Sequence, residues 1–274
     1  MSALDAALDT LESRVTDIDL TQHACTSGET ARQYAKRFLV ARDGDVDKAD
    51  AMLRDNDTWR RSGFLADAPA LACGGVAGLA ALPPADVVGC PAALLERYFD
   101  SWAQGVDREG RPVVYKKYGR LEVSTLVAAG ASVESLVRYH VGEQERLSIA
   151  MREASMGGAR VSAATFVMDA AGWHVGLATR DAMRFLRTIA EIDQAHYPER
   201  LGRLVVINAP VVLSGVFAIV STWLAPATRA KVRVLSWESA WRPALLELIA
   251  PDQLCEAYGG KSPRPAASAP HEPA

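Results

Sequence analysis

The chain has 274 residues, of which 49% are hydrophobic and 23% are charged. This composition excludes a disordered tail or a coiled-coil rod and predicts one large globular domain or two small ones. Thirty basic and 33 acidic residues give a formal net charge of -3, which offers no general attraction to a phosphate backbone. A nucleic-acid partner is therefore not expected.

The chain opens with acidic residues rather than with an apolar signal segment. Its cysteines show no C-x-x-C spacing, so neither a disulfide framework nor a thiolate metal site is expected. They are Cys25, Cys73, Cys90 and Cys255. We therefore expect a reducing, cytoplasmic location.

Two amphipathic helices are predicted near the N-terminus. Residues 26–29 (Thr-Ser-Gly-Glu) have the spacing of a capping box, and an apolar stripe runs from Ala31 to Phe38. Asp45 is placed to cap the second helix, which Gly63 ends.

These helices define an N-terminal helical subdomain over residues 1–65. Residues 66–92 are rich in Ala, Gly and Pro and are predicted to form a connector made mainly of loops. Glycines at positions 74, 75 and 78 lack the preceding strand and the GK[ST] ending of a phosphate-binding loop.

Strands and helices alternate from about residue 95 onward. The patterns predict strands at 112–115, 165–168, 204–207 and 232–235, with helices at 132–155 and 179–197 between them. Such alternation is typical of an α/β fold with a mainly parallel sheet. Pro243 is expected at the first position of a last helix, and residues 262–274 are expected to be a disordered tail.

No charged side chain occurs between Leu204 and Thr228. The turn signal Asn-Ala-Pro at 208–210 divides this stretch into a β-branched strand and a very apolar helix, so a membrane span is not predicted. A helix that is apolar on nearly every face is either buried or in contact with lipid. Considered without further context, the residues favour a central core helix.

The sequence contains little evidence for a catalytic site. The five histidines form no H-E-x-x-H pair, and no G-x-S-x-G elbow occurs. We interpret His196 as a helix-end residue and Asp169 as a residue that caps the turn after its strand. The sequence thus predicts no enzyme, no catalytic residue, no metal site and no cofactor.

Four stretches are more specific than these patterns. They are HYPERLGRLVVINAP at 196–210, DREGRPVVY at 107–115, RFLVARDGDVDKA at 37–49, and the closing Tyr-Gly-Gly at 258–260. Together they resemble the CRAL-TRIO family over roughly residues 28–261, and YPER with INAP resembles its secretory-pathway phosphatidylinositol transfer protein branch. The resemblance implies a lipid-binding domain at 93–261, whose mainly parallel sheet floors an apolar cavity closed by a mobile helical gate.

The family implies that one phospholipid is bound or exchanged without covalent chemistry. About thirty methylenes of a diacyl lipid, at roughly 0.8 kcal/mol each, would cost on the order of 20 kcal/mol in water. A gate must therefore be apolar toward both the cavity and the membrane, and with the resemblance we interpret the helix at 211–224 as this gate. Its expected acyl-chain contacts are Val212, Val216, Phe217, Ile219, Val220, Trp223 and Leu224.

A phosphatidylinositol headgroup needs cations, hydroxyls and a carboxylate. The residues that match the family's headgroup positions are Arg42, Asp107, Glu199, Thr228 and Lys231. Asp43 departs from the pattern, because the family has a second basic residue there, and its effect stays open.

Positions that would hold a phosphatidylcholine headgroup also differ. Members that carry this lipid have a serine, a threonine and tyrosines where this chain has Ala164, Phe166, Ala103 and Val114. Without an aromatic cage, the choline ammonium loses its cation–π stabilisation. Phosphatidylcholine in that pose is therefore disfavoured, and a second ligand stays open.

The sequence thus predicts a cytoplasmic, monomeric protein that binds phosphatidylinositol or a related phospholipid and visits membrane surfaces transiently. Two alternatives remain: a carrier of a small isoprenoid-like apolar ligand, and a transfer-inactive lipid-sensing interaction module.

Overall fold

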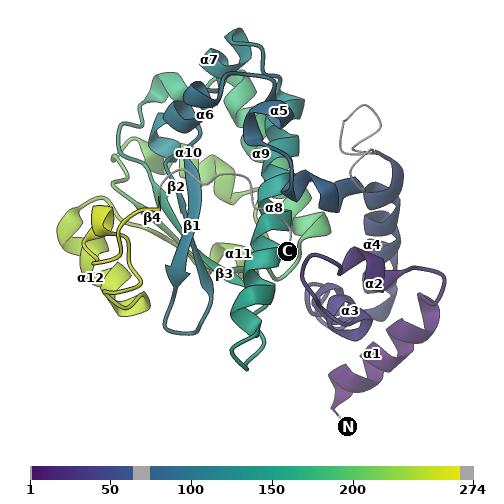
Figure 1. Cartoon of the computed structure of the whole chain (residues 1–274). Coiled ribbons are helices and arrows are strands. Elements are labelled where there is room, and N and C mark those ends of the chain that lie inside the picture. The colour runs from purple at the N-terminus through teal and green to yellow at the C-terminus, as the bar shows by residue number, and fades with distance from the viewer. Residues whose placement is uncertain (1, 64–74, 266–274) are drawn as a thin grey trace.

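In the computed structural model, which describes residues 2–63 and 75–265, one sheet separates two layers of helices (Figure 1). Its strands are β1 (Ser101–Val106), β2 (Pro112–Lys116), β3 (Ala164–Asp169), β4 (Leu201–Ile207) and β5 (Val232–Val234). They lie side by side in sequence order, with β1 antiparallel to β2 and every later pair parallel. The predicted α/β fold with a mainly parallel sheet is confirmed, and β1 is the strand that the sequence patterns missed.

The N-terminal helices form a separate bundle with its own core beside α8 (Figure 1). They are α1 (Ala3–Arg14), α2 (Leu20–His23), α3 (Ala31–Val40) and α4 (Val46–Thr58), followed by a π-helical turn at Trp59–Gly63. The remaining helices are α5 (Pro84–Val88), α6 (Ala92–Tyr98), α7 (Val123–Ala128), α8 (Val133–Ser155), α9 (Arg180–His196), α10 (Leu213–Ser221), α11 (Pro226–Arg229) and α12 (Glu238–Leu248).

Helix α3 begins one turn later than the predicted capping box. Thr30 is the N-cap: its hydroxyl accepts from the Gln33 amide N–H at 3.2 Å, and the Gln33 side chain accepts from the Thr30 N–H at 2.9 Å. The expectation for residues 26–29 is wrong because Gly28 forms a turn with φ +61° and Glu29 is buried among arginines. Asp45 caps α4 as predicted.

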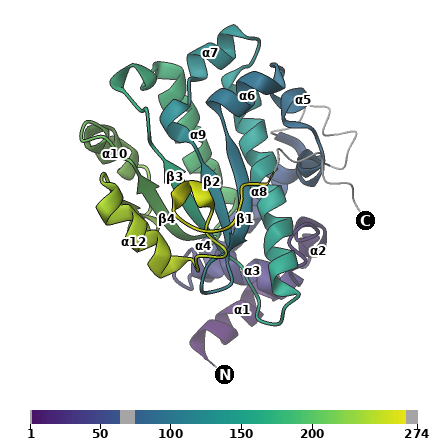
Figure 2. The same ribbon diagram turned by 60° about the vertical axis from the view of Figure 1, so that its left-hand side comes forward.

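The outer face of the sheet packs on α12. Val205 and Ile207 of β4 and Trp241 and Leu245 of α12 belong to one buried cluster, and Figure 2 shows α12 and α8 on opposite sides of the sheet. Pro243 lies inside α12 rather than at its first position. The helix tolerates it, although one main-chain hydrogen bond is lost, because buried residues anchor the helix on both sides of the ring.

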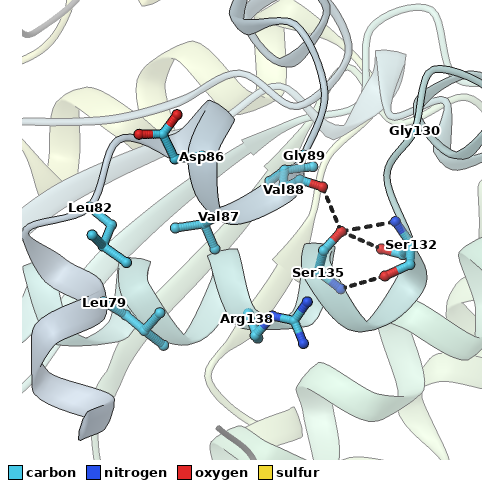
Figure 3. Close-up of a pocket in the computed structure, with 10 residues that line it drawn as sticks. All are labelled: Leu79, Leu82, Asp86, Val87, Val88, Gly89, Gly130, Ser132, Ser135 and Arg138. Carbon is cyan, nitrogen blue, oxygen red and sulfur yellow. Dashed lines mark hydrogen bonds between the residues drawn. The ribbon is translucent and has the colours of Figure 1, made fainter. Parts of the chain in front are cut away.

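The connector is more ordered than predicted. Val76 and Leu79 lie in a short helix (Gly75–Ala80), and together with Val88 they belong to the same buried cluster as Leu136 of α8. The Ser135 hydroxyl donates to the Val88 carbonyl at 2.8 Å and floors a hollow of about 380 Å³ (Figure 3). Residues 64–74, including the first glycine of the excluded phosphate loop, lie outside the described residues.

The chain stays attached to the domain beyond residue 261. Ser262 bridges to Cys255, and Arg264 pairs with Asp100 at 2.6 Å while lying 3.9 Å from the centre of the Trp102 ring. The predicted disorder from Ser262 is therefore wrong for residues 262–264. Residues 266–274 lie outside the described part of the chain.

Candidate functional site

The YPER motif mainly anchors the N-terminal subdomain. The Tyr197 hydroxyl donates to Glu145 at 2.7 Å, the Pro198 carbonyl accepts from Arg37 at 2.9 Å, and Arg200 donates to Glu29 at 3.0 Å. Of the four motif residues, Glu199 is the one that lines the pocket between α3 and the amino ends of β4 and β5. The other three motif residues, Tyr197, Pro198 and Arg200, thus hold the N-terminal helices against the rest of the protein.

Glu29 is the centre of a buried ionic cluster. Arg37 binds it with two hydrogen bonds of 3.0 Å, Arg200 adds a third, and the Ser27 hydroxyl donates at 2.8 Å. Burial would raise the pKa of Glu29, but Arg37 and Arg200 outweigh it and lower this pKa to about 2. The carboxylate therefore stays charged and holds α3 against the amino end of β4.

A second buried carboxylate secures the other end of the same interface. Glu145 of α8 accepts hydrogen bonds from Thr26 at 2.7 Å and from Arg60 at 2.8 Å, in addition to Tyr197. Next to it, the Trp59 and His196 rings stack with their centres 4.0 Å apart. Burial, and then the charge of Arg60, lower the pKa of His196 to about 4, which supports a structural role for this histidine.

A pocket of about 540 Å³ lies between α3 and the amino ends of β4 and β5. Two of its lining side chains are carboxylates, those of Glu29 and Glu199. Six are cationic, and we call it the basic pocket: Lys36, Arg37, Arg111, Arg160, Arg203 and Lys231.

The basic pocket brings two of the predicted headgroup residues together. Lys231 donates to Glu199 across 3.3 Å, and both side chains are partly exposed. Glu199 has φ +59°, which is strained for a residue with a Cβ and is typical of positions that a functional constraint maintains. The turn after Pro198 thus presents this carboxylate to the pocket.

The other three predicted headgroup residues do not line the pocket. Arg42 follows α3 and donates to the Ala41 carbonyl at 3.2 Å. The Thr228 carbonyl accepts the Lys231 N–H at 3.0 Å, so it shapes the turn that carries the lysine. Exposed Asp43 adopts φ +53°, a conformation that aspartate tolerates well.

Asp107 is occupied inside the hairpin between β1 and β2. One oxygen accepts from the amides of Glu109 and Arg111 at 2.9 Å each, and the other accepts from the Thr165 hydroxyl at 2.6 Å. With 6% of its surface exposed, Asp107 has little capacity left for a ligand. Its geometry fits a residue that positions Arg111, and this replaces our expectation of direct headgroup contact.

Sequence reasoning missed five of the six pocket cations, which are Lys36, Arg37, Arg111, Arg160 and Arg203. Arg111 reaches the pocket only because residue 202 is glycine, since a Cβ there would approach Arg111 Cδ to 2.8 Å. Arg111 stands in the tripeptide GRP at 110–112 and Arg203 in LGR at 201–203. No local sequence pattern shows that strands far apart in the chain bring these two arginines together.

Helix α10 has no charged side chain and an apolar, half-buried face. Leu213, Val216, Phe217 and Val220 follow helical spacing and are half-buried, whereas Ile219 on the other face is 51% exposed. None of its residues is fully buried. Helix α10 is therefore not a central core helix.

The inner face of the sheet, on which Leu213 of α10 packs, is incompletely covered. Phe166, Leu204 and Val232 are half-buried although β3 and β4 are central strands, whereas Val167 and Val205 on the outer face are at most 1% exposed. Leu213 packs in the same cluster as Leu204 and Val232. An apolar floor with residual exposure therefore lies under an apolar helix.

The C-terminal end of α10 is attached to α9 by one side chain. Gln194 donates to the Trp223 carbonyl at 2.9 Å and accepts from the Ala225 N–H at 2.8 Å. At the other end, the Ala209 N–H donates to the Leu235 carbonyl at 3.3 Å. Hydrogen bonds thus fix the segments before and after α10.

The phosphatidylcholine positions form one apolar row. Ala103 pairs with Val114, and Val114 pairs with Phe166, across β1, β2 and β3. Neither a hydroxyl nor a tyrosine ring is present in this row.

Asp169 has the structural role that its position predicts. It accepts the Ala171 N–H and the Asn208 amide at 2.9 and 2.8 Å, so it joins the turns after β3 and β4. Across residues 2–63 and 75–265, no group of three potential metal ligands occurs. Within the same ranges, no helix is long and apolar enough to cross a bilayer.

Known proteins resemble this chain in sequence and in fold. The family model described as CRAL/TRIO domain matches residues 97–260. Phosphatidylinositol/phosphatidylcholine transfer protein SFH4 of Arabidopsis thaliana is 30% identical over 226 residues, which are 82% of this chain and 34% of that protein. SEC14 cytosolic factor of Candida glabrata is 28% identical over 231 residues, covering 82% of this chain and 69% of that protein.

The chain thus spans about a third of the plant relative's length. The solved structure titled Crystal structure of Sfh5 shares the fold, with a TM-score of 0.65, 19% identity and coverage of 94% of this chain and 87% of that one. Since the family model covers more than half of the sequence, the chain belongs to the CRAL/TRIO domain family, within which it resembles the phosphatidylinositol transfer protein branch.

Proposed function

We propose that the protein binds one phospholipid, phosphatidylinositol, and moves or presents it between membranes. The acyl chains would occupy the space between α10 and the inner face of the sheet, and the headgroup would occupy the basic pocket. The observation that carries the proposal is α10 itself, a helix without a charged side chain that is nowhere fully buried and packs through Leu213 on a half-exposed apolar floor.

The two regions are continuous along β4 and β5. Leu201 lines the basic pocket and Leu204 belongs to the apolar floor, while Lys231 is followed directly by Val232, which pairs with Leu204. A lipid can therefore place its phosphate at the pocket and its chains over the floor without burying a charge in apolar surroundings. Glu199 would accept inositol hydroxyls, and Lys231 would bind the phosphodiester.

The outer face of the gate suits contact with a bilayer. Val211, Val212 and Ile219 are 73%, 62% and 51% exposed, an apolar surface that lipid would cover. We therefore propose that the protein works as a monomer in the cytoplasm and docks transiently through α10. Relatives named as phosphatidylinositol/phosphatidylcholine transfer proteins support this activity class.

The test begins with the lipid that copurifies with the protein. Solvent extraction and mass spectrometry should give phosphatidylinositol at about one molecule per chain. An isoprenoid would favour the carrier alternative, and an empty or mixed cavity would favour the lipid-sensing module. Either of these two results would overturn the proposal.

Transfer between vesicles then tests the site. Lys231→Ala combined with Glu199→Lys should abolish phosphatidylinositol transfer while the circular dichroism spectrum stays unchanged, because both side chains lie at a partly exposed rim. The matched control is Arg242→Ala combined with Glu238→Lys, which removes a pair of 3.0 Å on α12. Equal transfer by wild type and the first double variant would refute the headgroup site.

A further inference from the structure

The connections that follow β3, β4 and β5 carry most of the strongly exposed apolar side chains. Among the described residues, the most exposed large apolar side chains are Met156 at 83%, Val175 at 76%, Val211 at 73%, Trp237 at 69% and Val212 at 62%. Met156 follows α8, whereas the other four lie in these three connections. Single exposed apolar side chains are common on proteins, but a group of them indicates a contact surface.

These connections meet at one edge of the sheet. Strands β3, β4 and β5 are parallel neighbours, so their carboxyl ends lie side by side. The Asn208 amide donates to Asp169 at 2.8 Å, and the Ala209 N–H donates to the Leu235 carbonyl at 3.3 Å, which joins the three connections. We call their most exposed apolar residues the carboxyl-edge rim: Val175, Val211, Val212 and Trp237.

The chain segments that form the rim are uncharged. Residues 170–179, 208–228 and 234–237 contain no lysine, arginine, aspartate or glutamate. Protein partners normally meet an apolar centre surrounded by a polar border, whereas the apolar part of a bilayer disfavours every charged group. The rim is also continuous with α10, which begins directly after Val212. Its composition and its position therefore favour lipid as the partner.

Trp237 is suited to contact the surface of a bilayer. Indole rings collect at membrane–water interfaces because they combine an apolar body with an N–H donor. Of the six tryptophans in the chain, Trp237 is the exposed one. The acidic residue that follows it, Glu238, pairs with Arg242 at 3.0 Å, so its charge is compensated.

Two rim residues are fixed to the sheet rather than to α10. Trp237 directly precedes α12, whose Trp241 and Leu245 are buried in one cluster with residues of β4. Val175 lies in a short helix (Val175–Leu177) that follows β3. Neither residue belongs to α10, so both would stay in place during a movement of that helix.

We propose that the carboxyl-edge rim docks on the interfacial region of a lipid bilayer, and that Val175 and Trp237 hold the protein there while α10 opens. The inference rests on the proposed function and adds a fixed anchor to the docking through α10. The basic pocket lies at the amino ends of β4 and β5, so it would point away from the docked membrane. Because docking buries apolar side chains, it requires neither anionic lipid nor low salt.

The first test measures cosedimentation with vesicles of pure phosphatidylcholine. Val175→Asp and Trp237→Asp should each weaken vesicle binding about tenfold, because each puts a charge where an apolar side chain would be buried. Aspartate is a favoured residue at the helix N-cap, so Trp237→Asp preserves α12. The matched control is Met156→Asp, which changes the most exposed apolar side chain outside the rim and should leave binding unchanged.

Two results of this experiment would overturn the inference. Wild-type binding by both rim variants would show that α10 docks without the fixed anchor. Equal losses in Met156→Asp and the rim variants would show that any exposed apolar residue contributes, so that the rim has no special role.

Fluorescence then reports whether Trp237 enters the lipid. Phosphatidylcholine with brominated acyl chains should quench the tryptophan emission of wild type on vesicle binding. Trp237→Phe keeps an apolar ring and should still bind, but most of this quenching should disappear. Unchanged quenching in Trp237→Phe would show that another tryptophan contacts the bilayer and would refute the anchor.

Further measurements separate the bilayer from other partners. Vesicle binding should change by less than about twofold between low and high salt. Binding that requires phosphatidylserine and disappears at high salt would overturn the inference, because a charged surface would then carry the docking. Dimers in sedimentation equilibrium that Trp237→Asp dissociates would also overturn it, because a second copy of the chain would then cover the rim.

The inference and the proposed function can fail separately. Mass spectrometry of extracted lipid measures loading, whereas cosedimentation measures docking. Normal phosphatidylinositol loading together with vesicle binding that ignores the rim variants would overturn only the inference. Rim-dependent vesicle binding by a protein that carries no phosphatidylinositol would overturn only the proposed function.

Discussion

At the scale of single residues, the clearest constraint is the buried carboxylate of Glu29. Its side chain is 1% exposed and is held by Arg37 and Arg200. Removing one partner of such a cluster leaves buried charges uncompensated, which typically destabilises a protein by about 3–5 kcal/mol. We expect Glu29→Gln to lower the free energy of unfolding by this amount in urea titrations at neutral pH. Glu191→Gln, which breaks an exposed pair with Arg187, should change it by less than about 1 kcal/mol.

The contribution of Glu29 to the free energy of unfolding should depend on pH. Its pKa is about 2 in the folded protein, against an ordinary value of 4.5. A lowered folded-state pKa means that the contribution is complete above pH 4.5 and is lost as the pH falls toward 2. The wild-type free energy of unfolding should therefore drop by about 3 kcal/mol more than that of Glu29→Gln across this window. Parallel pH profiles would contradict the assignment.

Gly202 is a second position with a sharp constraint, because it leaves no room for a Cβ atom beside the Arg111 side chain. A Cβ there would come within 2.8 Å of Arg111 Cδ and 3.0 Å of the Ala164 carbonyl oxygen. Gly202→Ala should therefore displace the Arg111 side chain and weaken phospholipid binding at least severalfold in vesicle assays. Gly157→Ala is the matched control, because the nearest atom to a Cβ there is the Ala154 carbonyl oxygen at 3.8 Å, an ordinary contact. Unchanged binding by Gly202→Ala would show that Arg111 does not act in the site.

At the scale of elements, the two faces of α10 should have separable effects. Phe217 and Val220 lie on the half-buried face of α10 that begins at Leu213, so replacing both by aspartate should prevent lipid loading, measured by mass spectrometry of extracted lipid. Ile219→Asp places the same charge on the outer face, where it should leave loading intact and slow exchange between vesicles. Loss of loading in both variants would mean that α10 fails through misfolding rather than through its inner face.

The attachment of α10 to α9 gives a further prediction. Gln194 supplies both hydrogen bonds that hold the segment after α10, to Trp223 and Ala225. Gln194→Ala should therefore speed hydrogen–deuterium exchange of residues 213–224 and accelerate lipid exchange. Glu191→Ala, on the exposed side of α9, serves as the control. Unchanged exchange rates in Gln194→Ala would contradict the attachment.

The elements also show what the sequence can predict. Strands β2 to β5 and helices α3, α4, α8 and α9 follow from periodicity and caps, because these signals are local. Strand β1 was missed because its alternation is weak, and the buried connector was missed because Ala, Gly and Pro give no periodic pattern. In the site, only Glu199 and Lys231 were both predicted and found in the basic pocket, since Arg111 and Arg203 meet through β-strand order, which no local pattern encodes.

At the scale of the whole molecule, the buried interface between the N-terminal subdomain and the lipid-binding domain decides acid stability. His196 stacks on Trp59 at this interface, and its Nδ1 finds no partner within the described residues. Its pKa falls from an ordinary 6.5 to about 4, first through burial and then through Arg60. Because a neutral His196 is required, its contribution is complete above pH 6.5 and is lost as the pH falls toward 4.

We therefore expect the N-terminal subdomain to loosen before the sheet does when the pH is lowered from 6.5 to 4. Hydrogen–deuterium exchange should rise in residues 31–58 while residues 201–207 stay protected, because protonated His196 is repelled by Arg60 and must leave the stack. His196→Phe keeps an aromatic ring against Trp59 without a titrating group, so this rise should disappear in the variant. A rise of the same size in wild type and His196→Phe would show that another group at the interface carries the pH response.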